Sequence, residues 1–297
     1  MKIITPEEIT DTTLDTSNVP LTDYTEWTAG TYAEGATVRE GEEAYESLTA
    51  SNTDQPSVGI LANPPTWLRL GYVNRWRMFR DGTDSITSQA DSIAVTVIPV
   101  GLITAVALLG CRGATAQVIM TDTIEGVVYD QTKELIDYGV DDWWSFYFVP
   151  YDSNGDVIFR GLPPYIGAEI DVIIDGNDPA DIIECGRAVF GVEHDLGVTE
   201  YGTNVSRLDA STKERDGFGN LRLVRRRTVP VVDYRIAVET IRFDWVERRL
   251  ARIAAVPCVF IGSTLYESTI VFGIYTDFRM DLSTPVICDA TIEVEGL

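Results

Sequence analysis

Short apolar and β-branched runs, separated by turn signals, dominate the middle of the chain. Between residues 72 and 200 they recur at strand spacing, with almost no helical periodicity. The intervening turns include Asn154-Gly155, Pro163-Pro164 and Asp175-Gly176-Asn177. We therefore predict a jelly-roll β-sandwich over residues 72–200. Its expected strands are Ser92–Ile98, Thr104–Leu109, Gln117–Thr121, Gly126–Asp130, Trp143–Phe148, Val157–Leu162, Glu169–Ile174 and Cys185–Val192.

The pattern changes near residue 200, where a polar, glycine-marked and charged stretch indicates a domain junction. Residues 201–297 read as sheet, one helix, then sheet. A helix is predicted at 239–254, because Ile241, Trp245, Leu250 and Ile253 fall near helical spacing and Pro257 follows. The strand pair of Leu221–Glu239 precedes it, and Val259–Ile261, Ser268–Tyr275 and Pro285–Glu295 are the expected strands after it.

Residues 1–26 are rich in Thr, Asp and Pro and show little periodicity, so we predict an extended N-terminal arm. The arm either packs against a neighbouring subunit or is a loosely held terminus; the sequence favours neither. No apolar signal segment follows Met1. The most apolar stretch, Ile93 to Leu109, contains Pro99 and Gly101 and is short for a membrane span, so two buried strands and a soluble protein are expected.

Charge narrows the classes of partner. Lys and Arg total 23 against 46 Asp and Glu, a net charge of −23, which disfavours binding to nucleic acid or anionic membranes. Within this acidic chain, a basic stripe comprises Arg222, Arg225, Arg226 and Arg227. It is either a solvated edge strand protected by arginines or a subunit interface that faces the acidic surface of the next copy.

Catalytic and metal-binding motifs are lacking. The four cysteines are far apart with no C-x-x-C pair, so free buried thiols are expected rather than a zinc or redox site. The sole histidine, His194, is interpreted as a surface or junction residue, since no nucleophile motif accompanies it. Asp152–Asp156 resembles the start of a calcium loop but fits a hairpin turn better. We predict no enzyme and no cofactor. The only feature in favour of a glycan-hydrolysing enzyme is the abundance of carboxylates, such as Asp141 and Asp142.

A small aromatic unit occupies residues 27–71. Trp27, Tyr32, Tyr45 and Trp67 recur with Gly35 and Val38 in a spacing that resembles the chitin- and cellulose-binding modules of carbohydrate-binding families 5 and 12. In those modules, aromatic rings just after the second Tyr stack on sugar, whereas residues 48–52 here contain no ring. The four aromatic residues therefore form either a small core or a glycan site, and the core is the favoured interpretation.

The predicted jelly roll has a second resemblance. Its opening Asn74-Arg-Trp-Arg-Met-Phe79 and its closing Cys185-Gly-Arg-Ala-Val-Phe-Gly191 are similar to the edges of galactose-binding-like domains. Within it, Trp143 and Trp144 are adjacent, and strand alternation would point one ring inward and one outward. Trp144 is thus a candidate for sugar stacking, although both rings packed under a loop is an equally good interpretation.

Over most of its length the chain resembles a family of tail proteins of long-tailed bacteriophages, often described as carbohydrate-binding, from the distal tail or baseplate. Besides the aromatic unit and Asn74–Phe79, the carrying residues are Leu162–Tyr165, Gly186-Arg-Ala188, Asp195-Leu-Gly197, Thr199–Gly202, Lys213–Asn220, Pro257–Gly262, Tyr266-Glu-Ser268, Phe272–Phe278 and Ile292–Leu297. The resemblance implies that residues 201–297 form a tail-tube-like, ring-forming β-sandwich. The jelly roll and the small module would then project outward.

Two function hypotheses follow from that resemblance. The first is a structural tail-tip component assembled in the host cytoplasm and located in the virion. It would form a homo-oligomeric ring, a hexamer in preference to a trimer, that joins the tail tube and baseplate hub to the host-recognition apparatus or tail fibres. The arginine stripe and the 239–254 helix would lie at subunit contacts. The second is an adhesin that binds host surface glycan through exposed aromatic rings.

Overall fold

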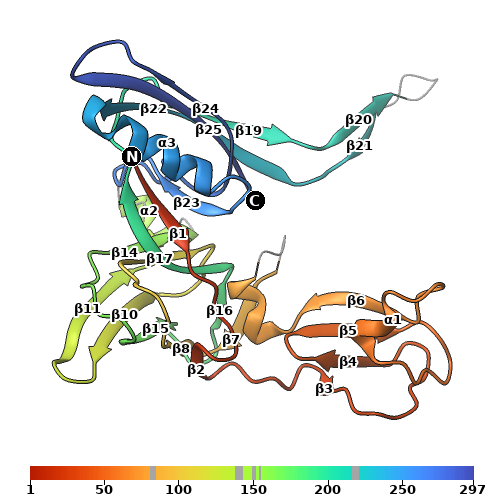
Figure 1. The fold of residues 1–297 in the computed structure, drawn as a ribbon. Coiled ribbons are helices and arrows are strands. Elements are labelled where there is room, and N and C mark those ends of the chain that lie inside the picture. Colours follow the sequence, from red (N-terminus) through yellow and green to blue (C-terminus); the bar gives the residue numbers. More distant parts are fainter. Residues whose placement is uncertain (81–84, 138–142, 149–151, 154, 216–220) are drawn as a thin grey trace. The chain divides into compact units, whose positions relative to one another are not determined.

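A computed structural model describes residues 1–80, 85–137, 143–148, 152–153, 155–215 and 221–297. Strand accounts for 51% of it and helix for 11%, which confirms the expected mainly β class, with large curled antiparallel sheets (Figure 1). The chain divides into two compact units. The first comprises Met1–Glu7 and Phe190–Leu297, and the second Glu8–Val189.

The first unit is built on one antiparallel sheet with the strand order β17-β1-β23-β24-β25-β22-β18. Strand β17 begins in the second unit, and β19 also pairs with β22. Its strands are β1 (Lys2–Pro6), β17 (Arg187–Asp195), β18 (Val198–Thr199), β19 (Asn204–Asp209), β20 (Thr212–Arg215), β21 (Leu221–Val224), β22 (Thr228–Glu239), β23 (Cys258–Ile261), β24 (Ile270–Asp281) and β25 (Ile287–Gly296). Its helical segments are η2 (Thr240–Arg242), α3 (Phe243–Arg252) and η3 (Glu267–Thr269).

Helix α3 covers one face of this sheet, as Figure 1 shows. Residues of β22 and β25 alternate between the buried and exposed faces, as the period of two requires. The buried positions of both strands join Val246 and Leu250 of α3 in one apolar core. The predicted helix therefore exists, although its exposed Ile241 and Trp245 are not core residues and Val246 is.

The second unit contains a five-stranded antiparallel sheet with the order β11-β10-β15-β8-β2. Strands β9 and β14, β7 and β16, and β12 and β13 form further antiparallel pairs. The bounds are β2 (Leu14–Ser17), β7 (Thr87–Ala90), β8 (Ser92–Val97), β9 (Ala105–Leu109), β10 (Thr115–Asp122), β11 (Gly126–Glu134), β12 (Ile136–Asp137), β13 (Asp152–Ser153), β14 (Val157–Arg160), β15 (Glu169–Asp175) and β16 (Ile182–Cys185), with the 3₁₀ helix η1 (Asn74–Phe79).

The small aromatic module is a separate four-stranded sheet of the second unit, ordered β3-β4-β5-β6, in which only β3 and β4 run parallel. Its elements are β3 (Thr25–Glu26), β4 (Thr37–Glu40), β5 (Glu43–Ser47), α1 (Pro56–Gly59) and β6 (Trp67–Tyr72). Gly59 lies directly under the Trp67 ring: a Cβ at Gly59 would be 2.3 Å from Trp67 Cδ1, so only glycine fits there.

Seven of the eight strands predicted between residues 92 and 192 are present within a few residues of their expected bounds. The eighth is wrong, because Trp143–Phe148 forms helix α2. Six residues with five aromatic rings have a high intrinsic strand tendency, but such a short apolar run does not determine the secondary structure. The predicted Asn154-Gly155 turn includes Asn154, which lies outside the described residues.

The N-terminal segment also differs from a simple arm. Residues Lys2–Pro6 form a strand hydrogen-bonded on both sides, to β17 and to β23, inside the first unit. Residues 14–17 form the edge strand β2 of the second unit. The interpretation as a loosely held terminus is therefore wrong for residues 2–6. The predicted domain ranges 1–26, 27–71, 72–200 and 201–297 stay predictions.

The apolar stretch Ile93 to Leu109 holds β8 and β9, as predicted, instead of a helix. In the part of the chain that the structure describes, no helix has the length and apolar character needed to cross a membrane.

Candidate subunit-interaction surface

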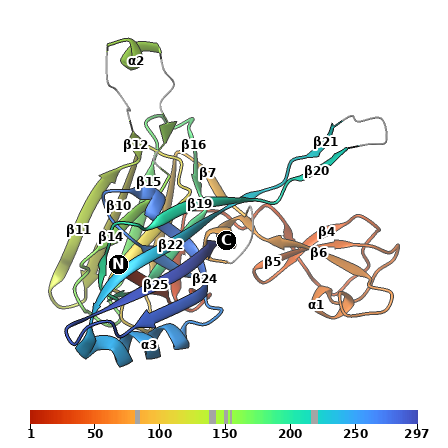
Figure 2. The same ribbon diagram turned by 90° about the horizontal axis from the view of Figure 1, so that it is seen from above.

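A two-stranded extension, defined here as residues 204–228 and called the basic hairpin, leaves the sheet of the first unit. Strand β19 pairs with the first half of β22, and beyond them β20 pairs with β21 (Figures 1 and 2). None of its described residues is buried; only Ser211 and Thr212 are half-buried. An isolated two-stranded hairpin is at best marginally stable in water, so this extension lacks a core that would hold it in place.

The hairpin concentrates positive charge. It carries seven basic and three acidic residues in a chain whose net charge is −23. All four arginines of the predicted stripe, Arg222, Arg225, Arg226 and Arg227, lie on it and are exposed. Among the described residues none of these four guanidinium groups makes an ion pair. The arginine stripe predicted from the sequence is therefore an exposed basic segment of the hairpin.

The register of β20 and β21 gives the two faces of the hairpin different character. Lys213 faces Leu223 and Arg215 faces Leu221, so one face combines cations with exposed leucines. Arg222 lies opposite Glu214 on the other face. Neither leucine was singled out from the sequence, although the alternation Leu221-Arg222-Leu223 in a polar, glycine-rich region was a usable signal.

The remaining arginines of the stripe, Arg225, Arg226 and Arg227, lie in the irregular segment between β21 and β22. The backbone N–H of Arg226 donates to Ser211 Oγ at 3.0 Å, and Ala210 N–H donates to the Arg227 carbonyl at 3.4 Å. The backbone is thus fixed across this irregular point while all three side chains remain exposed.

One acidic residue of the hairpin is strongly held in its charged form. Asp209 accepts hydrogen bonds from Ser211, and its carboxylate lies 3.1 Å from Lys213 Nζ. The Ser211 hydrogen bonds, followed by the Lys213 contact, lower the pKa of Asp209 to about 2. Lys213 is thus paired with Asp209 within the hairpin, whereas the four arginines of the stripe have no ion-pair partner among the described residues.

The same unit also exposes an acidic row. Glu293 of β25 lies between Asp233 of β22 and Asp277 of β24 in the register of the sheet, and all three are exposed. Like charges directly opposite one another on a sheet are destabilising. Arg279 lies 3.0 Å from the Asp277 carboxylate, so Asp233 and Glu293 contribute most of the negative charge of this row.

An apolar groove of about 650 Å³ lies elsewhere on the first unit. Its lining includes Val198, Tyr201, Leu265 and Tyr266, and all four of these side chains are exposed. Scattered exposed apolar residues are normal, but four large ones around one groove are typical of a contact surface.

The aromatic candidates of the small module form a core. Tyr45 and Trp67 are only 4% and 1% exposed, and Val38 completes their cluster. Trp27 and Tyr32 are half-buried and pack against this cluster, and the Tyr32 and Trp67 rings meet edge to face at 5.5 Å. The interpretation of Tyr45 and Trp67 as glycan-stacking rings is therefore wrong, since a sugar cannot reach them.

Hydrogen bonds fix the rings of this core. Trp67 Nε1 donates to the carbonyl oxygen of Asp54 at 2.9 Å, and the Tyr45 hydroxyl donates to Glu43. Burial, followed by the Glu43 hydrogen bond, raises the pKa of Tyr45 well above its usual value. These residues are positioned for stability, not for recognition.

Helix α2 presents aromatic rings to solvent instead. Trp143 is 79% exposed, Trp144 is 67% exposed, and Tyr147 is also exposed. The expectation of one inward and one outward tryptophan is wrong, because it assumed a strand. Trp143 and Tyr147, one helical turn apart, stack at 6.5 Å with an interplanar angle of 18°.

His194 lies on β17, half-buried, with its ring edge to face against Trp245 of α3 at 6.2 Å. Burial, followed by the nearby Arg249 charge, lowers the pKa of His194. Among the described residues, no serine or cysteine side chain forms a hydrogen bond with His194 that would make it a nucleophile. Within the described ranges no cluster of three or more His, Cys, Asp or Glu side chains is arranged to bind a metal ion.

Comparison with known protein families, with curated proteins and with solved structures finds no match to this chain.

Proposed function

We propose that this chain is a structural component of a bacteriophage tail tip or baseplate, which self-assembles into a ring that joins the tail tube to the host-recognition apparatus. The observation that carries the self-assembly step is the basic hairpin. It is exposed along its described length, has no core of its own and carries uncompensated arginines in a strongly acidic chain. The tail-tip assignment itself comes from the family resemblance of the sequence.

Charge gives the hairpin a natural partner in a second copy of the same chain. Its excess of cations is complementary to the acidic remainder of the protein, which includes the row Asp233, Glu293 and Asp277. A hairpin of one copy on the surface of the next is a head-to-tail contact. Such contacts produce closed rings when the rotation between copies closes. A hexamer is the preferred symmetry and a trimer the alternative.

Apolar surface supports the same proposal. Leu221 and Leu223 of the hairpin, and the groove around Tyr201 and Tyr266, give the first unit exposed large side chains that burial between copies would stabilise. The tail tube, the baseplate hub and the tail fibres are the further partners that the resemblance implies. The overall negative charge disfavours a role in binding nucleic acid.

The test is a double charge reversal, Arg225→Glu with Arg226→Glu, examined by light scattering after size exclusion and by negative-stain imaging. We expect the wild-type protein to form rings whose population falls as salt rises, because the contact is electrostatic. The double variant should weaken association by at least about 30-fold and leave a folded monomer.

The matched control reverses Arg69 and Arg112, two exposed arginines that lie outside both the hairpin and the acidic row, so the total charge changes equally. This control should still assemble. Normal rings from the Arg225/Arg226 variant, or equal losses in variant and control, would reject the hairpin as the assembly element. A wild-type protein that stays monomeric at all concentrations would contradict self-assembly without a template.

A second function, binding of host surface glycan, is favoured by one observation. Three exposed aromatic rings, Trp143, Trp144 and Tyr147, lie together on helix α2, and flat exposed rings are the usual stacking surface for sugars. This places the candidate glycan site on α2 instead of the small module.

Calorimetry with host polysaccharides tests this second function. Trp144→Ala should abolish binding, whereas Tyr201→Ala, which removes an even more exposed ring from the first unit, should not change it. Absence of binding by the wild-type protein across the polysaccharides of the host would reject the adhesin function and leave the assembly proposal untouched.

A further inference from the structure

Two of the four buried thiols lie side by side in the second unit. Cys111 follows β9 and Cys185 ends β16, 74 positions apart in the sequence, yet their Sγ atoms are 3.7 Å apart. All four cysteines are free and buried, as the sequence predicted. The proximity of this pair was not predicted, because the spacing of cysteines along a chain carries no information about long-range strand pairing.

The backbone register places the two residues directly opposite each other. Arg112 and Glu184 exchange both backbone hydrogen bonds, N–H of Arg112 to O of Glu184 at 2.8 Å and the reverse at 3.0 Å. The next pair along an antiparallel ladder is a non-hydrogen-bonded pair, in which side chains are closest. Cys111 and Cys185 are that next pair, and their own backbone contacts point outward, to Gly155 and to Thr87.

This position has the geometry that a disulfide requires. Opposite residues of a non-hydrogen-bonded pair have Cα atoms about 4.5 Å apart, within the range of roughly 4.4–6.8 Å seen across disulfides. A glycine pair adjoins the cysteines: Gly186 N–H donates to the Gly110 carbonyl at 3.2 Å. A Cβ at Gly186 would lie 3.1 Å from the Leu109 carbonyl oxygen, so glycine permits the close approach of the two backbones.

We propose that Cys111 and Cys185 form a reversible cross-strand disulfide when the folded protein meets a small-molecule disulfide oxidant such as oxidised glutathione. In the first step the thiolate of one cysteine attacks the glutathione disulfide, and one glutathione thiol leaves. In the second step the thiolate of the other cysteine attacks the mixed disulfide and releases the second glutathione. The two thiol protons pass to the two glutathiones, so the cysteine pair is oxidised by two electrons and the glutathione disulfide is reduced.

Burial determines how this reaction proceeds. A hydrogen bond with Cys185, together with burial, raises the pKa of the Cys111 thiol, so little thiolate is present in the closed structure. Oxidation therefore requires transient opening of the Arg112–Glu184 contact and is slow in the native protein. The same burial slows reduction of the completed disulfide without preventing it.

The disulfide would enclose three of the five strands of the β11-β10-β15-β8-β2 sheet in one covalent loop. Residues 112–184 include β10, β11, α2 and β15, and the bond ties together the two ends of this segment. Closing a long loop stabilises a protein chiefly by restricting its unfolded state. A protein made in a reducing compartment would thus become more resistant to unfolding after release into an oxidising medium.

The test uses the full chain, incubated with oxidised glutathione and then mapped by mass spectrometry without reduction. We expect an intact mass lower by two hydrogens, a peptide link between Cys111 and Cys185, and a rise in melting temperature on the order of 5–10 °C that dithiothreitol reverses. Cys111→Ala and Cys185→Ala should each lose the link and the shift, whereas Cys258→Ala should keep both.

Because the mapping is done on the wild-type chain, a variant that folds poorly does not affect the conclusion. Four thiols that all remain alkylatable after denaturation, or a link that joins a different pair, would overturn the proposal. A Cys111–Cys185 link that leaves the melting temperature unchanged would overturn the stabilising role.

Discussion

The small aromatic module and the basic hairpin are both β extensions of modest size, but they hold their shape by opposite means. The module surrounds Val38, Tyr45 and Trp67 with four strands. The hairpin, in its described part, buries no residue at all. The first has an apolar core of its own, whereas the described part of the second has none.

The difference shows how aromatic residues and charges should be interpreted. Rings at regular spacing were consistent with a core or a glycan site, with the core favoured. Burial of Trp67 and Tyr45 contributes about 1.5–3 kcal/mol each to stability and leaves both rings inaccessible. The arginines were consistent with either a solvated edge strand or a subunit interface, and all four lie on an exposed hairpin that also carries exposed leucines.

The largest expected effect is that of Trp67→Ala. The substitution removes the most buried ring of the module and leaves a cavity beside Gly59, so it should lower the free energy of unfolding by about 3–5 kcal/mol. Limited proteolysis should then cut within residues 25–72 first. A variant whose module resists proteolysis like the wild type would contradict the core assignment.

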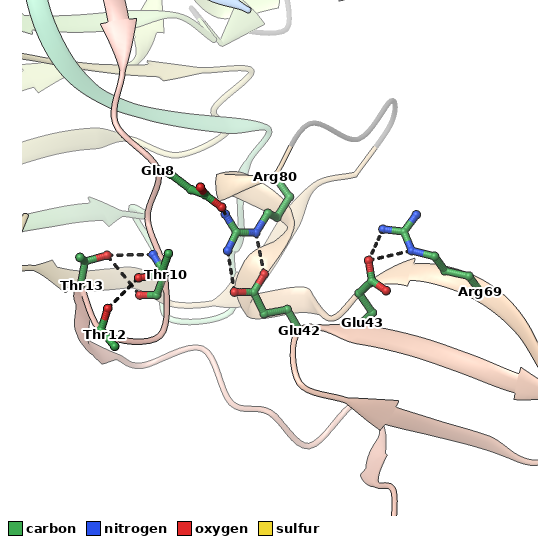
Figure 3. Close-up of polar contacts among 8 residues, drawn as sticks. All are labelled: Glu8, Thr10, Thr12, Thr13, Glu42, Glu43, Arg69 and Arg80. Carbon is green, nitrogen blue, oxygen red and sulfur yellow. Dashed lines mark hydrogen bonds and ion pairs between the residues drawn. The ribbon is translucent and has the colours of Figure 1, made fainter. Parts of the chain in front are cut away.

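A smaller effect is expected from the ion pair between Arg80 and Glu42, which connects the module to the segment that follows it in the chain. Figure 3 shows Arg80 forming two hydrogen bonds to Glu42, each 2.6 Å long, with Glu8 as a weaker third partner at 3.5 Å. Arg80→Ala should cost about 1–3 kcal/mol in chemical denaturation, because both side chains are largely buried. Arg80→Lys, which keeps the charge and loses the paired geometry, should recover only part of this stability.

Acid should weaken the module through Glu43. Burial opposes its charge, but hydrogen bonds from Arg69 and Tyr45 outweigh burial and lower the pKa of Glu43 (Figure 3). A lowered carboxyl pKa gives stability that is present above the unfolded-state pKa and lost as pH falls through the folded-state pKa. The expected loss is below about 1 kcal/mol, since the pair is partly exposed. Arg69→Met should flatten this part of the pH profile of unfolding, and an unchanged profile would reject the assignment.

Removing one charge from the acidic row of Asp233, Glu293 and Asp277 should increase stability. Glu293→Gln removes the central charge between Asp233 and Asp277. Asp277 is already paired with Arg279 at 3.0 Å, so the repulsion from Asp233 dominates, and at low salt the substitution should raise stability by about 0.2–1 kcal/mol. Glu239→Gln, at the exposed end of β22, is the control and should change stability less. A loss of stability in Glu293→Gln would show that the row is compensated by contacts other than the opposing carboxylates.

The smallest effect on the isolated chain is expected from Leu221→Ser combined with Leu223→Ser. Both side chains are exposed, so the unfolding free energy should change by less than about 0.5 kcal/mol. Ring formation should nevertheless be weakened, because apolar contacts at an interface are lost. Equal destabilisation of the monomer would mean that the hairpin contributes to the fold of its own subunit.

Sequence patterns predicted the elements of this protein more successfully than their contacts. The alternation of β25 and the helical spacing before Pro257 are local signals, and both elements are present. The failure at Trp143–Phe148 came from an aromatic run too short to distinguish strand from helix. The Cys111–Cys185 contact and the acidic row depend on register between distant strands, which the periodicity of a single strand does not contain.

The candidate site was predicted only in part. Arg222 and Arg225–Arg227 stand out by charge, but their significance comes from the exposed, coreless hairpin that carries them. The choice between core and glycan site for Tyr45 and Trp67 was decided by packing against Val38, not by their spacing.

Hydrogen exchange of the backbone amides in residues 204–215 and 221–228 is the most direct test of the central claim, that a second copy orders the basic hairpin. The exchange would be measured by mass spectrometry at protein concentrations above and below the assembly threshold, with residues 287–296 of β25 as an internal reference. We predict fast exchange of the hairpin in the monomer and strong protection in the assembled protein, while β25 stays protected in both. Equal protection of the hairpin at all concentrations, or fast exchange within the assembled ring, would contradict the claim.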